Sequence, residues 1–107
     1  MSNAKSPNGS EDAIRAIVFR AGDSYVAQCI EYDIAVQSAD LASLVDRLQL
    51  TLEAEFVTCE ERGKVPRDCI IPAPNYYHEL WAKRTVELKR INVPVAQGPV
   101  VQIAMAA

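Results

Sequence analysis

YVAQCIEYDIAVQSAD, residues 25–40, leads directly into LASLVDRLQLTLEAEF, residues 41–56. Two short apolar runs in the first part, Tyr25–Ile30 and Ile34–Val36, have the length and residue types of β-strands, and the polar corner between them suits a tight reversal. From Leu41 onward, apolar residues recur at helical spacing and form a single stripe, which comprises Leu41, Leu44, Val45, Leu48, Leu52 and Phe56. The sequence therefore predicts strands that lead into one long helix, which needs a sheet to pack against.

The residues before this stretch predict a further strand at Ile14–Arg20, joined to Tyr25–Ile30 by a turn at residues 21–24. With Ile34–Ser38 this makes an antiparallel three-stranded meander. Phe19 lies on the sheet face opposite the long helix, so that face needs another cover. Ser38 or Asp40 is expected to cap the helix, which should end near Arg62 because Gly63 follows.

Three prolines between residues 64 and 74 predict an extended connector, with Ile70 and Ile71 packed on the core. Asn75 is expected to cap a second helix from about Tyr76 to Arg90, although residues 85–88 alternate and are also compatible with a strand. A last strand is predicted at residues 100–104. The expected fold class is α+β: an antiparallel three- to four-stranded sheet in the order β-β-β-α-(α)-β, with one long helix packed on one face.

The length of 107 residues predicts one domain, covering residues 13–107. Residues 1–12 have the composition of a tag remnant followed by a disordered tail. No apolar run approaches the roughly 20 residues that span a bilayer, and no charged-then-apolar segment precedes the first strand. These features predict a cytoplasmic protein with no membrane association.

The three cysteines are an odd number, are far apart and fit no disulfide framework, which predicts reduced thiols. Cys59, Cys69 and His78 do not have the spacing of a zinc site, so we expect no metal, and no motif calls for another cofactor. His78 is expected to be an ordinary surface histidine.

Charge is distributed unevenly along the chain. Residues 11–63 carry eleven acidic and four basic side chains, whereas residues 64–107 carry six basic and three acidic ones. An acidic sheet-and-helix unit repels nucleic-acid phosphates and attracts basic protein surfaces. The acidic half is suited to a basic protein partner, but charge alone favours a solvated surface without a partner.

The pattern of a first strand, a hairpin into Tyr-Val-Ala-Gln-Cys-Ile-Glu-Tyr and a run Asp-Ile-Ala-Val-Gln-Ser before a leucine-patterned helix resembles the HicB-like antitoxin family. The resemblance covers residues 14–62. It implies a partial ribonuclease H-like domain and, in function, neutralisation of a small basic toxin that cleaves messenger RNA. Many members carry a C-terminal DNA-binding segment, but no such segment is recognisable in this sequence.

The residues also bear on catalysis and on partner binding. No phosphate loop, nucleophile elbow, Cys-His pair or converging set of metal-binding carboxylates is apparent, so we expect a protein that is not an enzyme. An antitoxin-like module would contact basic residues of its partner through exposed acids and anchor the contact with aromatic side chains. The candidate partner-binding residues are Tyr25, Glu31, Tyr32, Asp33 and Asp46.

Two other functions remain open. A DNA-binding regulator would use the basic residues of the second predicted helix, which are Lys83, Arg84, Lys89 and Arg90. An orphan domain without a cognate toxin would associate chiefly with itself, because the second sheet face is apolar. A homodimer is expected on that ground, with the second helix folding back within its own chain as the alternative cover.

Overall fold

The computed structural model describes residues 14–83, 86–92 and 100–106, and for residues 86–92 and Val100 it describes the backbone alone. The predicted tail at residues 1–12 therefore lies outside the described residues. Five strands and three helices follow one another along the chain: β1 (Ile14–Ala21), β2 (Ser24–Cys29), β3 (Ala35–Ser38), α1 (Leu41–Glu61), α2 (Pro66–Cys69), α3 (Asn75–Ala82), β4 (Val86–Asn92) and β5 (Val100–Met105).

The strands form one sheet in the order β3-β2-β1-β5-β4. The predicted meander is confirmed, because β1 pairs antiparallel with β2 and β2 with β3. The prediction of a wholly antiparallel sheet is wrong, because β5 pairs parallel with β1, with Ile14 opposite Val101. The α+β class is confirmed, with a mixed sheet of five strands where three or four were expected.

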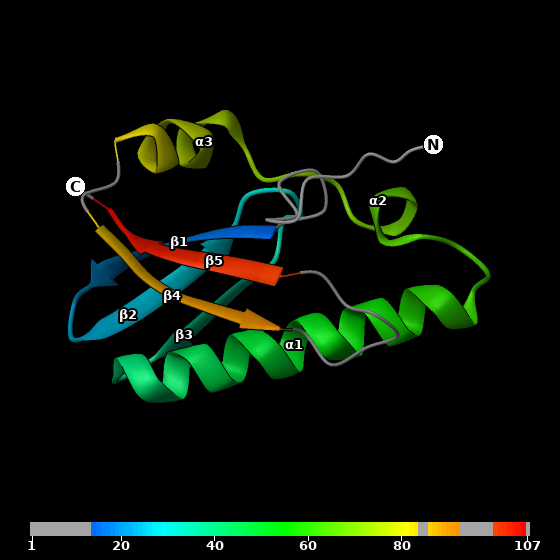
Figure 1. Ribbon diagram of the computed structural model, residues 1–107, viewed down its shortest axis with the longest axis horizontal. Helices are drawn as coiled ribbons and strands as arrows, with labels where there is room; N and C mark the ends of the chain where they lie inside the picture. The colour runs from blue at the N-terminus through cyan, green and yellow to red at the C-terminus, as the bar shows by residue number, and fades with distance from the viewer. Residues whose placement is uncertain (1–13, 84–85, 93–99, 107) are drawn as a thin grey trace.

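One long helix covers one face of this sheet (Figure 1). The Asp40 carboxylate accepts a hydrogen bond from the Ser43 amide at 2.8 Å and so caps α1. That bond, together with the Ser43 hydroxyl, lowers the pKa of Asp40 from its usual value, because both favour the charged form. The predicted stripe is confirmed, since Leu44, Leu48 and Leu52 are almost inaccessible to solvent.

Part of the opposite face of the sheet is covered by α3, which packs on β1 (Figure 1). A second core lies there, in which Trp81 of α3 packs with Ile17, Ile30 and Ala104. Phe19 stacks on Tyr77 of α3 with ring centroids 6.1 Å apart. The second helix thus folds back within its own chain, and the expected homodimer stays a prediction.

The predicted helix from about Tyr76 to Arg90 starts where expected, within one residue, but its predicted cap and its predicted end are wrong. The helix α3 begins at Asn75, with Pro74 and not Asn75 at the N-cap, and it ends at Ala82, where the Lys83 amide closes the last turn. Residues 86–92 form β4, paired antiparallel with β5. The alternating pattern of residues 85–88, which was also compatible with a strand, indicated the correct structure for residues 86–88. β-branched residues such as Val86 favour a pleated strand over a helix.

The connector departs from its prediction in two respects. Pro66 begins a single helical turn, α2, since proline is tolerated at the first position of a helix. Ile70 packs on the core as expected, but Ile71 is 72% exposed.

The prediction of reduced thiols at Cys59 and Cys69 is also wrong, because a disulfide joins them with 6.2 Å between their Cα atoms. Two cysteines ten positions apart match no framework in sequence, but the turn after α1 brings α2 back beside the last turn of the helix. The third cysteine, Cys29, is a buried free thiol. Disulfides are rare in the cytosol. The Cys59–Cys69 disulfide is therefore unexpected for a protein with the predicted cytoplasmic location.

Candidate partner-binding surface

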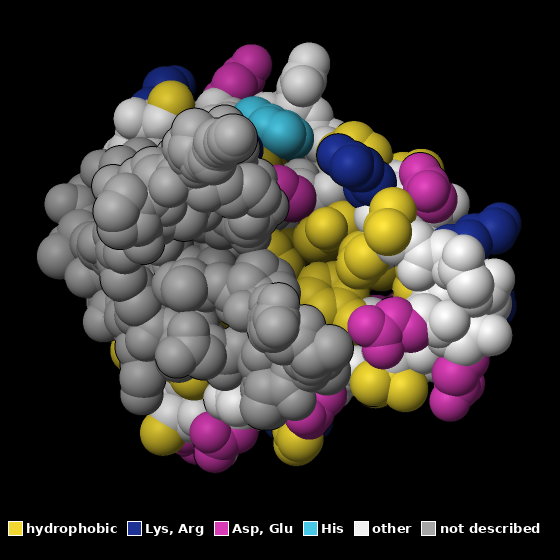
Figure 2. Space-filling model, turned by 45° about the vertical axis from the view of Figure 1, so that its right-hand side comes forward, with side chains coloured by type: hydrophobic (Ala, Val, Ile, Leu, Met, Phe, Trp, Pro, Cys, Tyr) yellow, Lys and Arg dark blue, Asp and Glu magenta, His cyan; other side chains and the backbone are white. Residues whose placement is uncertain are grey.

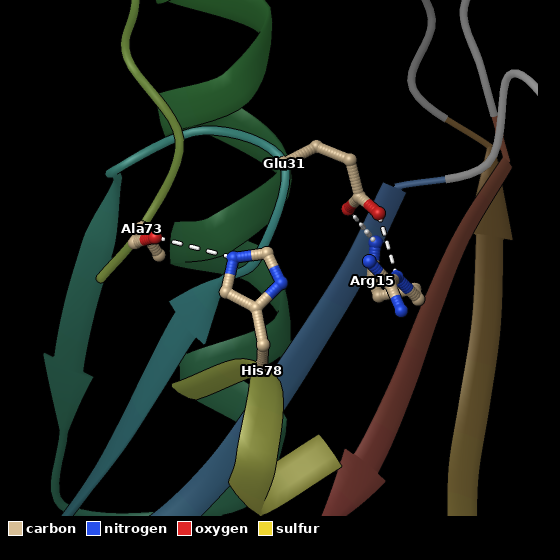
Figure 3. A network of polar contacts seen from close by, with 4 residues as sticks. All are labelled: Arg15, Glu31, Ala73 and His78. Atoms are coloured by element: carbon tan, nitrogen blue, oxygen red, sulfur yellow. Dashed lines mark hydrogen bonds and ion pairs between the residues drawn. The ribbon is translucent and has the colours of Figure 1, made fainter. Parts of the chain in front are cut away.

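Glu31, a predicted partner contact, is held by an internal ion pair. Its carboxylate accepts hydrogen bonds from the Arg15 amide at 2.7 Å and from Arg15 Nε at 2.6 Å (Figure 3). The Arg15 guanidinium also lies over the Trp81 ring, 5.8 Å from its centroid. Glu31 therefore links the β2–β3 loop to β1, and a basic partner would have to compete with Arg15 for it.

The neighbouring loop residues are also engaged within the chain. Tyr32 packs edge-on against Phe56 of α1, with 5.5 Å between ring centroids. Asp33 accepts a hydrogen bond from the buried Gln28 side chain at 3.0 Å, and its amide donates to the Ile71 carbonyl. These contacts fasten the loop to the core and to the connector.

His78 lies close to the same connector. Its Nε2 is 3.2 Å from the carbonyl oxygen of Ala73, whose amide donates to the Ile30 carbonyl (Figure 3). The predicted surface histidine is therefore half-buried and ties α3 to the connector. In the part of the chain that the structure describes, no three His, Cys, Asp or Glu side chains lie close enough to hold a metal ion.

Tyr25 lies toward the other end of the sheet, beside the β1–β2 turn. It pairs with Arg20 on β1 and with Ser38 on β3. The Arg20 guanidinium lies 4.9 Å from the Tyr25 ring centroid, in the range of a cation–π contact. At about 3.3 Å per strand residue, roughly 20 Å of chain separates Tyr25 from Glu31.

Asp46 is the one predicted acid that lies on a broad exposed face. It is on α1, turned away from the buried leucines. At 3.6 residues per turn, six residues share this side of the helix. We call them the outer stripe: Asp46, Leu50, Glu53, Val57, Glu60 and Glu61.

The outer stripe combines negative charge with exposed apolar side chains. The whole of α1 carries five carboxylates and one cation, Arg47. Leu50 is 64% exposed and Val57 is 39% exposed, and seven positions separate them on one face. Acidic and hydrophobic side chains lie together along the lower side of Figure 2, at the level of α1 in Figure 1.

Sequence reasoning missed Leu50 and Val57. Both fall outside the core stripe of α1, and an apolar residue off the core face of an amphipathic helix is the signal that could have identified them. The five predicted residues thus form no single site: three belong to a loop fastened to the core, Tyr25 lies toward the other end of the sheet, and Asp46 lies on the outer stripe.

The predicted DNA-binding cations do not share a helix. Lys83 follows the last turn of α3, while Lys89 and Arg90 belong to the strand β4, and Arg84 lies outside the described residues. The premise of four cations on one helix face is therefore wrong.

Comparisons with known proteins assign neither a family nor a function to this chain. No protein-family description, no curated protein and no solved structure matches this chain. Among the described residues, no helix has both the length and the apolar character needed to cross a membrane.

Proposed function

We propose that this chain is a protein-binding module of the HicB-like antitoxin kind, which neutralises a small basic toxin that cleaves messenger RNA. The observation that carries the proposal is the outer stripe of α1, where four acids surround two exposed apolar side chains. Such a surface complements a basic patch with an apolar centre. The meander β1–β2–β3 followed by α1 is also the order of elements that the family resemblance implies.

Charge and apolar contact have separate roles in this proposal. The acids attract the partner over distance and raise the association rate, because like charges elsewhere on the chain add to their field. Leu50 and Val57 supply the desolvated centre, which in protein interfaces carries most of the binding free energy. Replacing an apolar residue should therefore weaken binding more than replacing an acid.

The test begins with the reading frames beside the gene, where we expect a small basic protein; the absence of such a protein would contradict the antitoxin proposal. We expect co-expression to relieve the toxicity of that protein and the purified pair to form a complex. Leu50→Asp should weaken binding about tenfold or more, as expected for a central contact. Asp46→Lys combined with Glu60→Lys should slow association.

Asp23→Lys combined with Glu79→Lys is the matched control, since both side chains are exposed and the pair makes the same change of net charge away from α1. A neighbouring basic protein that kills cells with or without this chain contradicts the antitoxin proposal. Equal weakening by the control pair and by the α1 pair contradicts the placement of the site on the outer stripe.

A further inference from the structure

The strand β3 lies at one end of the sheet and pairs with β2 on one side (Figure 1). The amide of Cys29 donates to the carbonyl of Ile34, and in an antiparallel ladder such bonded pairs recur at every second residue. Val36 therefore bonds to β2, whereas the amide and carbonyl groups of Ala35 and Gln37 point away from β2. We call these four backbone groups the open edge, and among the described residues no strand lies beyond them.

The two outer strands of the sheet differ in how they resist the addition of another strand. The sequence of β4 contains Glu87, Lys89 and Arg90, and its pairing with β5 shifts register between Glu87 and Lys89. Charged residues and bulges of this kind keep foreign strands away from the edges of natural sheets. The sequence of β3, Ala-Val-Gln-Ser, has no charged residue and no proline, and it pairs with β2 in unbroken register. The open edge therefore remains available for pairing.

We propose that the open edge binds a basic, extended segment of another protein, which adds to the sheet as a new strand beside β3. Amides and carbonyls that alternate along an edge are satisfied by the backbone of an extended chain, so this geometry selects a strand over a helix. On the α1 side of the sheet, the side chains of the added strand would extend the layer formed by Val36, Leu41 and Val45, which are half-buried and pack against the core. We therefore expect apolar side chains at every second position of the bound segment.

Charge at the two ends of β3 favours a basic segment over a second copy of this chain. Asp33 precedes the strand and Asp40 follows it, and both are exposed. Their hydrogen-bond donors, the Gln28 amide and Ser43, are neutral, so both carboxylates keep their negative charge. A segment with Lys or Arg near each end would match these charges. Two copies of β3 paired in either direction would instead place an aspartate of one copy beside an aspartate of the other, where like charges repel.

The test uses the full chain and the peptide Lys-Thr-Val-Thr-Val-Thr-Lys, and it is independent of the antitoxin proposal because it involves neither a toxin nor the outer stripe. We expect the peptide, titrated to millimolar concentration, to shift the nuclear magnetic resonance signals of the Ala35 and Gln37 amides. Gln37→Pro removes one donor of the open edge and no bond to β2, so the dissociation constant should rise at least about tenfold while thermal unfolding shows that the fold is retained. Gln37→Ala is the matched control, because it changes the same side chain but keeps the amide, and it should alter the dissociation constant less than about twofold.

A second measurement tests the choice of a basic segment. Asp33→Asn combined with Asp40→Asn keeps both hydrogen-bond acceptors but removes both charges, so this variant should bind the peptide about two- to tenfold more weakly. The same peptide with Glu in place of Lys should bind the wild-type chain more weakly still. The proposal is overturned if the amides of β3 do not shift, if Gln37→Pro and Gln37→Ala bind alike, or if the acidic peptide binds as tightly as the basic one. A wild-type dimer in sedimentation that Gln37→Pro dissociates would also overturn it, because a second copy would then occupy the open edge.

Discussion

Leu48 and Leu50 are two positions apart on the same helix and have opposite environments. Leu48 is fully buried between α1 and the sheet, whereas Leu50 is 64% exposed. We expect Leu48→Ala to lower the free energy of unfolding by about 2–5 kcal/mol, through lost burial and the cavity left behind. Leu50→Ala should change it by less than about 0.5 kcal/mol. Urea unfolding of both variants measures the difference, and equal losses would contradict the orientation of α1.

Cys29 shows what burial does to a reactive group. Burial, and secondarily the nearby charge of Glu31, raise the pKa of its thiol to about 12. Since the thiolate is the reactive form, the thiol stays protonated until the pH approaches that value.

We expect Ellman's reagent to find no reactive thiol in the native protein at about pH 8, where a free cysteine of ordinary pKa reacts readily. In denaturant without reductant it should find one thiol, and after reduction all three cysteines. Rapid reaction of the native protein would contradict either the burial of Cys29 or the disulfide.

At the scale of elements, the spacing of apolar residues predicted α1 and the meander β1–β2–β3, because each of these elements buries one face. Their ends were also predictable, because residues that favour a helix cap or a turn lie there. Gly22 and Gly63, for instance, both adopt the positive φ expected of a turn and of a helix end. The second half was harder to predict. Its elements are short, and what separates α3 from β4 is packing on Ile17 and pairing with β5, neither of which is encoded in local spacing.

The same reasoning explains the limits of the predicted site. Sequence identified the acids but not their partners, so Glu31 was expected at an interface and is found paired with Arg15. Arg15 and Glu31 are sixteen positions apart and are brought together by the pairing of β1 with β2, which places Ala16 opposite Cys29. Asp46 was identified on α1, but the apolar residues beside it were not.

The Cys59–Cys69 link joins the end of α1 to α2. A disulfide closing a loop of about ten residues restricts the unfolded chain and adds roughly 3 kcal/mol to stability. We expect Cys69→Ser to lower the free energy of unfolding by about that amount, measured by urea unfolding without reductant. Wild-type protein measured with reductant should show a similar loss, and identical midpoints in all three conditions would show that the link does not form.

At the scale of the whole molecule, the response to salt tests how far charge drives partner binding. The Debye length shortens from about 10 Å at 0.1 M to about 3 Å at 1 M. Association with a basic partner through the acidic outer stripe should slow and weaken over this range, because salt screens the attraction between the two surfaces. Titration calorimetry at both salt concentrations measures this response. Binding that is equally tight at both salt concentrations would contradict a role for the acids of the outer stripe.

The place of β1 in the sheet has a consequence for biosynthesis. β1 lies between β2 and β5, and Ile14 faces Val101 across the parallel pair. While the ribosome is still making residues 86–105, one side of β1 has unpaired amides and carbonyls beside an incomplete apolar core. A nascent chain in that condition is prone to pair with other chains, and this exposure ends only when β5 has been made and has paired with β1.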